Sequence, residues 1–199
     1  MVSVVSSQPK VTEKYNAALS FNALTDRGIS KDTAVKYGVK SEEFAGKITK
    51  HIYPYYSGTD IVGTKGRNVA QKNFYCNGTL ENTGLFGEQL FKQGGKYLTI
   101  TEGECDAMAV YEMFKGNWSV VSLKRGASAA VKDIRESIEF VESYDNVVLC
   151  FDTDKQGKEA AKRVAKILKP NKTKIMTLPT QYKDANDMLR AGQHKAYVH

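Results

Sequence analysis

The chain has 199 residues, of which 41% are hydrophobic, so it can bury the core of one medium-sized domain or of two small ones. Its formal net charge of +7 favours polyanionic partners, although residues 101–150 hold nine acids against five Lys and Arg. Three cysteines and three histidines without a C-x-x-C pair exclude a zinc ribbon, and no signal peptide or long apolar run is found. Cys105 and Cys150 lie in apolar patterns and are expected to be buried, reduced thiols of a cytosolic protein.

The first half of the chain is predicted to form a small α+β subdomain over residues 13–95, after a flexible polar tail at 1–12. Ser30 is the expected N-cap of a short helix that ends at Gly38. Residues 48–75 are rich in β-forming side chains around a Ser57-Gly58-Thr59-Asp60 turn, which is typical of β structure. We expect a second domain to begin after Gly94-Gly95 and to span residues 96–199.

Strand and helix patterns alternate through this second domain. Strands are expected at about 97–101, 118–123, 146–151 and 174–178, and helices at about 105–115, 127–142, 156–168 and from Asp184. Repeated βα units of this length predict a parallel sheet with right-handed crossovers and flanking helices. The expected fold class is therefore α/β.

Acidic residues follow the first and the third of these strands. Glu102 comes after Tyr97-Leu98-Thr99-Ile100, and Asp152 and Asp154 come after Asn146-Val147-Val148-Leu149-Cys150. Ligands gather at the carboxyl ends of parallel strands, and three carboxylates there favour Mg²⁺ or Mn²⁺ and phosphoryl-transfer chemistry. For Glu104 and Asp106, capping and solvation of the following helix are favoured instead.

These motifs resemble the primase part of the primase-helicases of short-tailed bacteriophages, which has a Toprim fold. The Toprim pattern is a Glu-Gly-Glu after a first strand and an Asp-x-Asp after a third, here Glu102-Gly103-Glu104 and Asp152-Thr153-Asp154. Four more motifs match those phage proteins: Lys72-Asn73-Phe74, Leu85-Phe86-Gly87, Gly126-Ala127-Ser128-Ala129-Ala130 and Lys183-Asp184-Ala185-Asn186. The resemblance covers roughly residues 16–192, and an ordered series of six motifs is far more specific than any one of them.

The resemblance implies a DNA primase core, a DNA-directed RNA polymerase that makes short RNA primers on single-stranded DNA by metal-dependent nucleotidyl transfer. Glu102, Asp152 and Asp154 would be the catalytic residues and would hold Mg²⁺ or Mn²⁺ together with Asp184, for which a helix N-cap is an equal alternative. Implied partners are the template, ribonucleoside triphosphates, an RNA primer, and the helicase and zinc-binding modules that this sequence lacks. A monomer without membrane contact, in the cytoplasm of an infected bacterium, is also implied.

Basic residues at positions that match the phage primases would contact the template or the nucleotide. Lys65, Arg67 and Lys72 would lie at the edge between the two subdomains, where a solvated surface is an equal alternative for each. Arg125 and the backbone amides from Gly126 to Ser128 could hold a phosphate at a helix start. Here Lys124-Arg125 replaces a glycine and a histidine of the phage pattern, which affects nucleotide or template preference more than activity.

The helix after Asp154 carries six cations, which are usually a solvated face. Lys158 is the one placed near the acidic site, and the others could broaden a nucleic-acid surface.

Two other function classes remain open. A Toprim nuclease or topoisomerase-like enzyme would cleave strands without incorporating nucleotides, and the sequence indicates no tyrosine nucleophile among its eleven Tyr. The second class is a non-catalytic module that binds single-stranded DNA beside a helicase. Such a module would show no loss of activity when Glu102, Asp152 and Asp154 are replaced.

Overall fold

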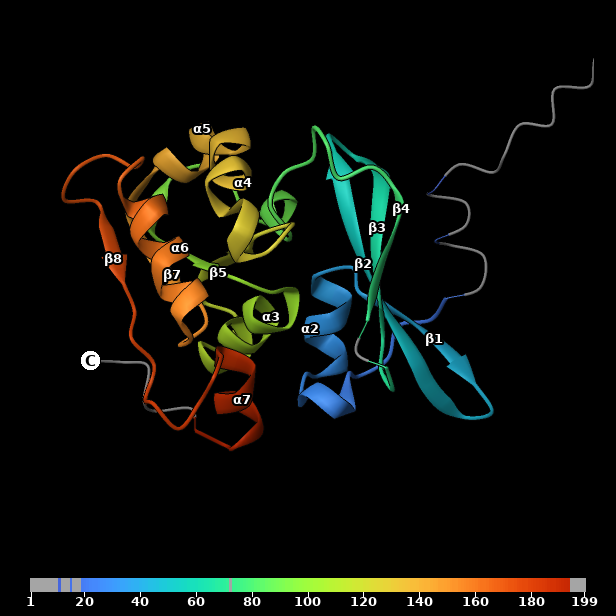
Figure 1. Ribbon diagram of the computed structural model, residues 1–199. Coiled ribbons are helices and arrows are strands. Elements are labelled where there is room, and N and C mark those ends of the chain that lie inside the picture. Colours follow the sequence, from blue (N-terminus) through green and yellow to red (C-terminus); the bar gives the residue numbers. More distant parts are fainter. Residues whose placement is uncertain (1–10, 12–14, 16–18, 72, 194–199) are drawn as a thin grey trace, which may run out of the picture.

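The computed structural model describes residues 11, 15, 19–71 and 73–193, and contains two four-stranded sheets packed into two lobes (Figure 1). Residues 1–10 and 12 of the expected tail lie outside the described residues. One sheet is antiparallel and the other parallel with helices around it, which confirms the predicted α/β class with an α+β subdomain before it. None of the described helices is long and apolar enough to cross a membrane.

The antiparallel sheet is a meander in which each strand pairs with the next along the chain. Its strands, in spatial order, are β1 (Lys40–Phe44), β2 (Lys47–Ser57), β3 (Asp60–Asn68) and β4 (Phe74–Gly78). Ser57 pairs with Asp60 across the predicted turn. The short helix α2 (Lys31–Lys36) precedes this sheet, and the Ser30 side chain caps it by accepting a hydrogen bond from the Thr33 amide, as predicted.

The parallel sheet has the spatial order β6-β5-β7-β8, so the first and third of its strands are neighbours at its centre. The strands are β5 (Gly95–Thr101), β6 (Ser119–Ser122), β7 (Tyr144–Cys150) and β8 (Thr173–Ile175). The expected boundary between residues 95 and 96 falls inside β5, and a division of the chain there stays a prediction. β8 is shorter than expected, since only three of its residues pair with β7.

Five α-helices lie in the described part of this half: α3 (Glu104–Met113), α4 (Ala130–Glu136), α5 (Ile138–Glu142), α6 (Lys155–Ala165) and α7 (Ala185–Arg190). Short 3-10 turns also occur: η1 (Thr25–Arg27), η2 (Glu88–Leu90) and η3 (Ala127–Ala129). The single helix expected over 127–142 is wrong in one respect, because Ser137 leaves helical geometry and separates α4 from α5. The apolar spacing of that segment is continuous, so periodicity alone does not reveal the break.

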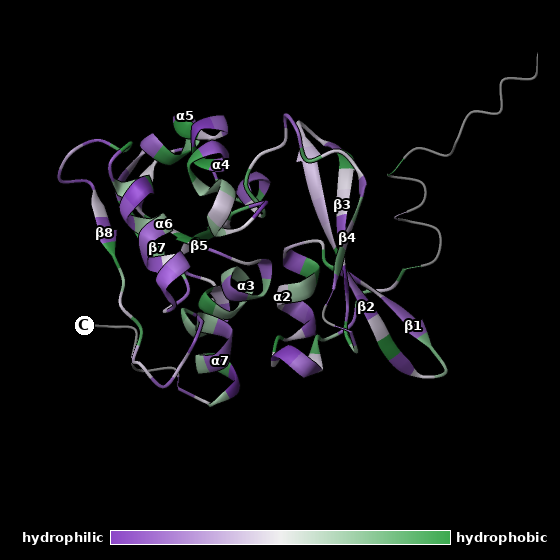
Figure 2. Ribbon diagram, in the orientation of Figure 1, coloured by the Kyte–Doolittle hydropathy of each residue, from purple (hydrophilic) through white to green (hydrophobic). Residues whose placement is uncertain are grey.

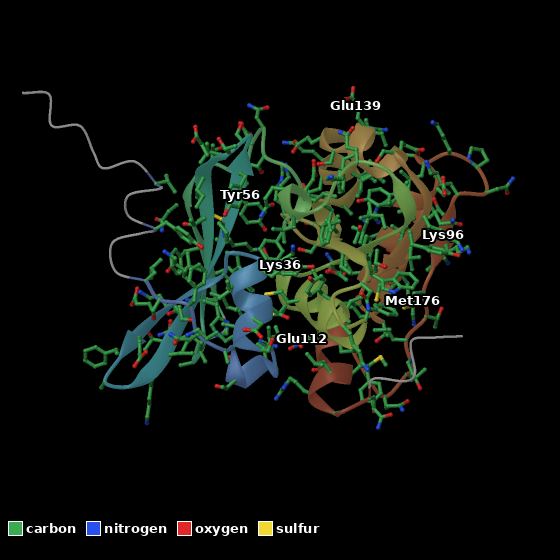
Figure 3. All side chains as sticks on the ribbon, turned by 180° about the vertical axis from the view of Figure 1, so that it is seen from behind. Lys36, Tyr56, Lys96, Glu112, Glu139 and Met176 are labelled. Carbon is green, nitrogen blue, oxygen red and sulfur yellow. The ribbon has the colours of Figure 1, made fainter. Side chains whose placement is uncertain are left out.

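Two apolar clusters cover the two faces of the parallel sheet. One of them joins the lobes, because it combines Tyr37, Tyr53 and Phe86 with residues of α3 and α7. The Tyr37 hydroxyl donates to the carbonyl of Val120 on β6 at 2.9 Å. Where α2 meets α3, Glu112 accepts a hydrogen bond from the Ser30 amide, and Lys36 lines the same groove (Figure 3). The lobes are therefore fixed to each other by a shared core and direct polar contacts.

Candidate active site

The central strands β5 and β7 end side by side, because Thr101 pairs with Cys150 in the parallel register. Glu102 follows β5 directly and Asp152 follows β7 after one intervening residue, Phe151. The backbone of Asp152 lies close enough to the Glu102 carboxylate to oppose the rise in its pKa. The two acidic motifs therefore meet at the carboxyl edge of the sheet, where ligands bind in open α/β folds.

Three carboxylates from separate elements converge beside this edge. They belong to Asp106 in the first turn of α3, Asp152 after β7 and Asp184 at the start of α7, and one oxygen of each lies within 4.8 Å of the others. Three such oxygens at this spacing suit a hard divalent cation such as Mg²⁺ or Mn²⁺. This group of three includes Asp152 and Asp184 from the sequence prediction, but neither Glu102 nor Asp154.

Asp106 and Glu104, assigned above to helix capping and solvation, are both buried, so that expectation is wrong. Asp106 accepts a hydrogen bond from the backbone amide of Asn186 at the start of α7 rather than from its own helix. Glu104 accepts one from the Tyr55 hydroxyl at 2.7 Å and pairs with Lys65 at 2.8 Å. The sequence signal that could have identified Asp106 is its place four residues after Glu102, in the same acidic motif and in the first turn of α3.

The convergence of like charges perturbs the protonation of the group. Burial raises the pKa of Asp106 well above its usual value, and the charges of Asp184 and Asp152 raise it further. Burial also raises the pKa of Asp152, against the opposing effect of Lys183, whose ammonium lies 2.9 Å from Asp152 Oδ2. Within the described residues, Lys183 is thus the cation that partly neutralises a site of excess negative charge.

Glu102 is half-buried beside this group, and its Oε2 atom is buried without a hydrogen-bond partner among the described residues. Burial raises the pKa of Glu102, and the charge of Asp152 adds to the effect. A buried carboxylate oxygen without a partner is costly unless a ligand satisfies it. The oxygen-only donor set and this unsatisfied oxygen both fit a divalent cation at the site.

Asp154 and Asp184 each cap a helix with one of their two carboxylate oxygens. Asp154 Oδ1 accepts from the Gly157 amide at 2.9 Å, and Asp184 Oδ1 accepts from the Asp187 amide at 2.7 Å. Capping and metal binding are therefore compatible at both residues, because a carboxylate has a second oxygen. Asp184 belongs to the converging group, whereas Asp154 is exposed at its border.

The predicted basic residues of the first lobe have different environments. Lys65 lies between the lobes, where its ammonium contacts Glu104 and the carbonyl of Lys124. The side chain of Arg67 is only 5% exposed and pairs with Asp26 at 3.4 Å, so it is not free to grip a phosphate. Lys72 lies outside the described residues.

Residues of the second lobe that were predicted to bind nucleotide or template lie around the same edge. Arg125 pairs with Asp133 at 2.8 Å and also contacts Glu136. Gly126 has a φ of 72°, which L side chains rarely adopt, and it places the exposed Ser128 in the turn η3. Arg163 of α6 donates to the carbonyl of Ala127 in this turn. Lys158 is exposed on α6 and lines a small hollow together with Asp152.

A cavity of about 130 Å³ opens between the lobes next to the converging carboxylates. Its wall includes the acidic residues Asp106, Asp184 and Glu104 and the guanidinium-bearing residues Arg27 and Arg67. An acidic centre bordered by cations can attract both a divalent ion and an anionic group that binds to it. The arrangement suits chemistry at a phosphate held near a metal ion.

Sequence and structure comparisons agree with this geometry. A profile of the Toprim-like family matches residues 99–189. The DNA helicase/primase of Enterobacteria phage T3 is 36% identical over 182 residues, which make up 89% of this chain and 31% of that protein. The primase fragment of the bacteriophage T7 primase-helicase has a TM-score of 0.80 and 35% identity, over 88% of this chain and 72% of that one.

A second T7 structure, of the lagging-strand DNA polymerase interacting with primase domains bound to an RNA/DNA hybrid, also matches. Its TM-score is 0.80 at 34% identity, over 89% of both chains.

Proposed function

Because this chain belongs to the family of Toprim primase domains of phage primase-helicases, we propose that it is the core of a DNA primase, which joins ribonucleotides into a short RNA primer on single-stranded DNA. The observation that supports this most strongly is the convergence of Asp106, Asp152 and Asp184 beside Glu102. In this reaction a 3′-hydroxyl attacks the α-phosphate of a ribonucleoside triphosphate and pyrophosphate leaves. The chain would thus be a nucleotidyltransferase.

Asp106, Asp152 and Asp184 would hold Mg²⁺ or Mn²⁺, with Glu102 Oε2 as a further donor. A bound divalent ion would neutralise phosphate oxygens and lower the pKa of the attacking hydroxyl. Glu102 has a raised pKa, which suits a group that accepts the proton of that hydroxyl. Asp154 is the third catalytic residue that we propose, together with Glu102 and Asp152. One of its carboxylate oxygens caps α6, and the other is not used in the cap.

The remaining residues would position the anionic substrates. Lys65, Lys158, Arg125 and the Gly126–Ser128 turn border the carboxylates and would contact nucleotide or template phosphates, and Lys72 stays a prediction of the same kind. Arg67 is better assigned to holding Asp26, because the arginine side chain is buried and paired with that carboxylate. Lys183 would neutralise Asp152 and leave it when a metal ion binds.

The proposed partners are single-stranded DNA, ribonucleoside triphosphates and an RNA primer, in the cytoplasm of an infected bacterial cell. The chain spans 31% of the T3 relative, so we also propose that it works with helicase and zinc-binding modules, in the same protein or in separate chains. By itself it would be a monomer.

The test is incorporation of labelled ribonucleotides on single-stranded DNA with a short RNA primer, in Mg²⁺ and in Mn²⁺. Asp152→Asn keeps the shape of the side chain and removes its charge. Asp145→Asn, at an exposed position of the preceding strand β7, is the matched control. We expect Asp152→Asn to lower extension by roughly 100-fold or more and the control to match the wild type. Equal extension by all three proteins would refute the proposal, and metal-dependent strand cleavage without extension would favour a nuclease.

A further inference from the structure

The net charge of the chain is concentrated in one short segment. Residues 155–174 hold eight of the 29 Lys and Arg and one of the 22 Asp and Glu, so the 21 basic and 21 acidic residues elsewhere balance. The formal charge of +7 therefore belongs to this segment alone, which consists of α6, the loop after it and most of β8. Figure 2 shows α6 coloured mainly as hydrophilic.

Four of these cations form a stripe along one face of α6. Lys155, Lys158, Lys162 and Lys166 are spaced by three, four and four residues, which places them on the same side of an α-helix, and all four are exposed. The opposite face carries small and apolar residues, and it is buried: Gly157, Ala160, Ala161 and Val164. With a rise of 1.5 Å per residue, the stripe is about 17 Å long.

The four stripe lysines have no ion-pair partner within the part of the chain that the structure describes. Other cations of the segment are engaged: Lys172 contacts Glu142, and Arg163 donates to the carbonyl of Ala127. Like charges one turn apart destabilise a helix by a few tenths of a kcal/mol per pair. The stripe is thus a small cost to the free protein, which an external polyanion would offset.

The stripe begins at the candidate active site. Asp154 is the N-cap of α6, and Lys155 is the first residue of the helix. Lys158 and Asp152 line the same hollow. From there the stripe follows the helix away from the carboxylates, so it can contact a nucleic acid only where the nucleic acid extends beyond the reacting end.

We propose that the Lys155–Lys158–Lys162–Lys166 stripe binds the sugar-phosphate backbone of the primer–template duplex as it leaves the site. The inference rests on the proposed function, since primer synthesis is what forms that duplex. Proteins that hold single strands combine a basic groove with aromatic side chains that stack on bases, and residues 155–174 contain no aromatic residue. A helix ridge of point charges without stacking groups fits a duplex, in which the bases are paired and the backbone faces outward.

The test measures binding rather than synthesis, so it is independent of catalysis. A labelled RNA/DNA hybrid is titrated in the absence of divalent ions and nucleotides at several salt concentrations, and its affinity is measured by fluorescence anisotropy. The variant carries Lys155→Gln, Lys158→Gln, Lys162→Gln and Lys166→Gln. Its matched control removes the same charge from four exposed lysines elsewhere, with Lys31→Gln, Lys36→Gln, Lys47→Gln and Lys115→Gln.

We expect the stripe variant to reduce the slope of log affinity against log salt by about 3 to 4 and to bind the hybrid at least roughly 10-fold more weakly, because about one counterion is released per phosphate contact. The control should change little, and Lys→Arg at the four stripe positions should restore both values. The inference would be overturned if the control variant lost as much affinity for the hybrid as the stripe variant, or if the stripe variant bound the hybrid as the wild type does. It would also be overturned if the stripe variant bound only single-stranded DNA of the same length more weakly, and not the hybrid.

Failure of this proposal and failure of the proposed function are distinguishable. If the stripe variant binds the hybrid normally and Asp152→Asn abolishes primer extension, only the duplex surface is rejected. If the stripe variant shows the reduced salt slope but the wild type never extends a primer, only primer synthesis is rejected. Thermal unfolding of each variant ensures that weaker binding does not come from loss of the fold.

Discussion

Replacing Asp106 by asparagine should stabilise the metal-free protein at neutral and alkaline pH. One oxygen each of Asp106, Asp152 and Asp184 lies within 4.8 Å of the others, and two ionised carboxylates at that distance repel by about 3 kcal/mol at an effective dielectric constant near 20. Asparagine keeps a side-chain oxygen, so it can still accept the hydrogen bond from the Asn186 amide that Asp106 now accepts at 3.0 Å. The substitution therefore removes repulsion while preserving the contact between α3 and α7.

The sign of the pH dependence follows from the raised pKa of Asp106. A carboxyl group whose pKa is higher in the folded than in the unfolded protein binds more protons when folded, so its contribution to stability is present at low pH. That contribution is lost as the pH rises from the unfolded pKa through the folded one. Besides burial, the charges of Asp184, Asp152 and Glu102 raise the pKa of Asp106, whereas Lys183 acts on Asp152. The advantage of Asp106→Asn should be near zero around pH 4 and grow with pH.

The assay is thermal unfolding between pH 4 and pH 9, with and without Mg²⁺. An advantage of about 3 kcal/mol corresponds to a rise of roughly 6 to 12 °C in Tm for a chain of this size. Mg²⁺ at about 1,000 times its Kd should reverse the order, because it stabilises the wild type by about 4.1 kcal/mol and the variant lacks a ligand. Asp145→Asn is the control. An Asp106→Asn protein that is less stable than the wild type at pH 8 without metal, or that is still stabilised by Mg²⁺ as the wild type is, would contradict this prediction.

Three further predictions concern the framework of the site. Lys124 is fully buried and contacts the Thr83 carbonyl at 2.7 Å and Glu136 at 2.6 Å, so Lys124→Ala should lower the free energy of unfolding by about 3 to 5 kcal/mol in urea. The 59% exposed Lys132 is its control, and an equal effect of Lys132→Ala would contradict this. Gly157→Ala would place a Cβ atom 2.4 Å from the Asp152 carbonyl oxygen. It should lower the free energy of unfolding by about 1 to 3 kcal/mol and weaken Mg²⁺ binding. Wild-type stability and Mg²⁺ binding would show instead that the turn tolerates a side chain. In thiol labelling at pH 7.5, the exposed Cys76 should react first, because Cys150 is buried and burial raises the pKa of Cys105 to about 12. Fast modification of Cys105 would be inconsistent with a buried environment for its thiol.

Much of the fold could be predicted from local patterns. Short apolar runs separated by helical periodicity identified β5, β6 and β7, and their order along the chain placed the residues after β5 and β7 at one edge. Ser30 was predicted as a cap, and capping was an equal alternative to metal binding for Asp184, because a capping interaction lies within three residues of the sequence. The parallel sheet and the preceding α+β subdomain followed from the same signals.

The parts that could not be predicted depend on contacts between distant segments. Asp106 joins the converging carboxylates only because α3 packs against α7, 80 residues further along the chain. Arg67 reads as an exposed cation in sequence, yet its strand lies against the segment that carries Asp26. Lys124 is another example, because a lysine is almost never fully buried unless its ammonium is paired, and its partners come from the loop after β4 and from α4.

Titration of Mn²⁺ into the protein, with free Mn²⁺ followed by electron paramagnetic resonance, tests whether Asp106, Asp152 and Asp184 hold one ion. We predict that the wild type and Asp145→Asn bind the ion alike. Asp106→Asn, Asp152→Asn and Asp184→Asn should each bind it at least roughly 10-fold more weakly, because each loses one oxygen donor and one charge at the same point. Undiminished binding by these three variants would contradict the claim that the carboxylates after β7, in α3 and at the start of α7 form one metal site.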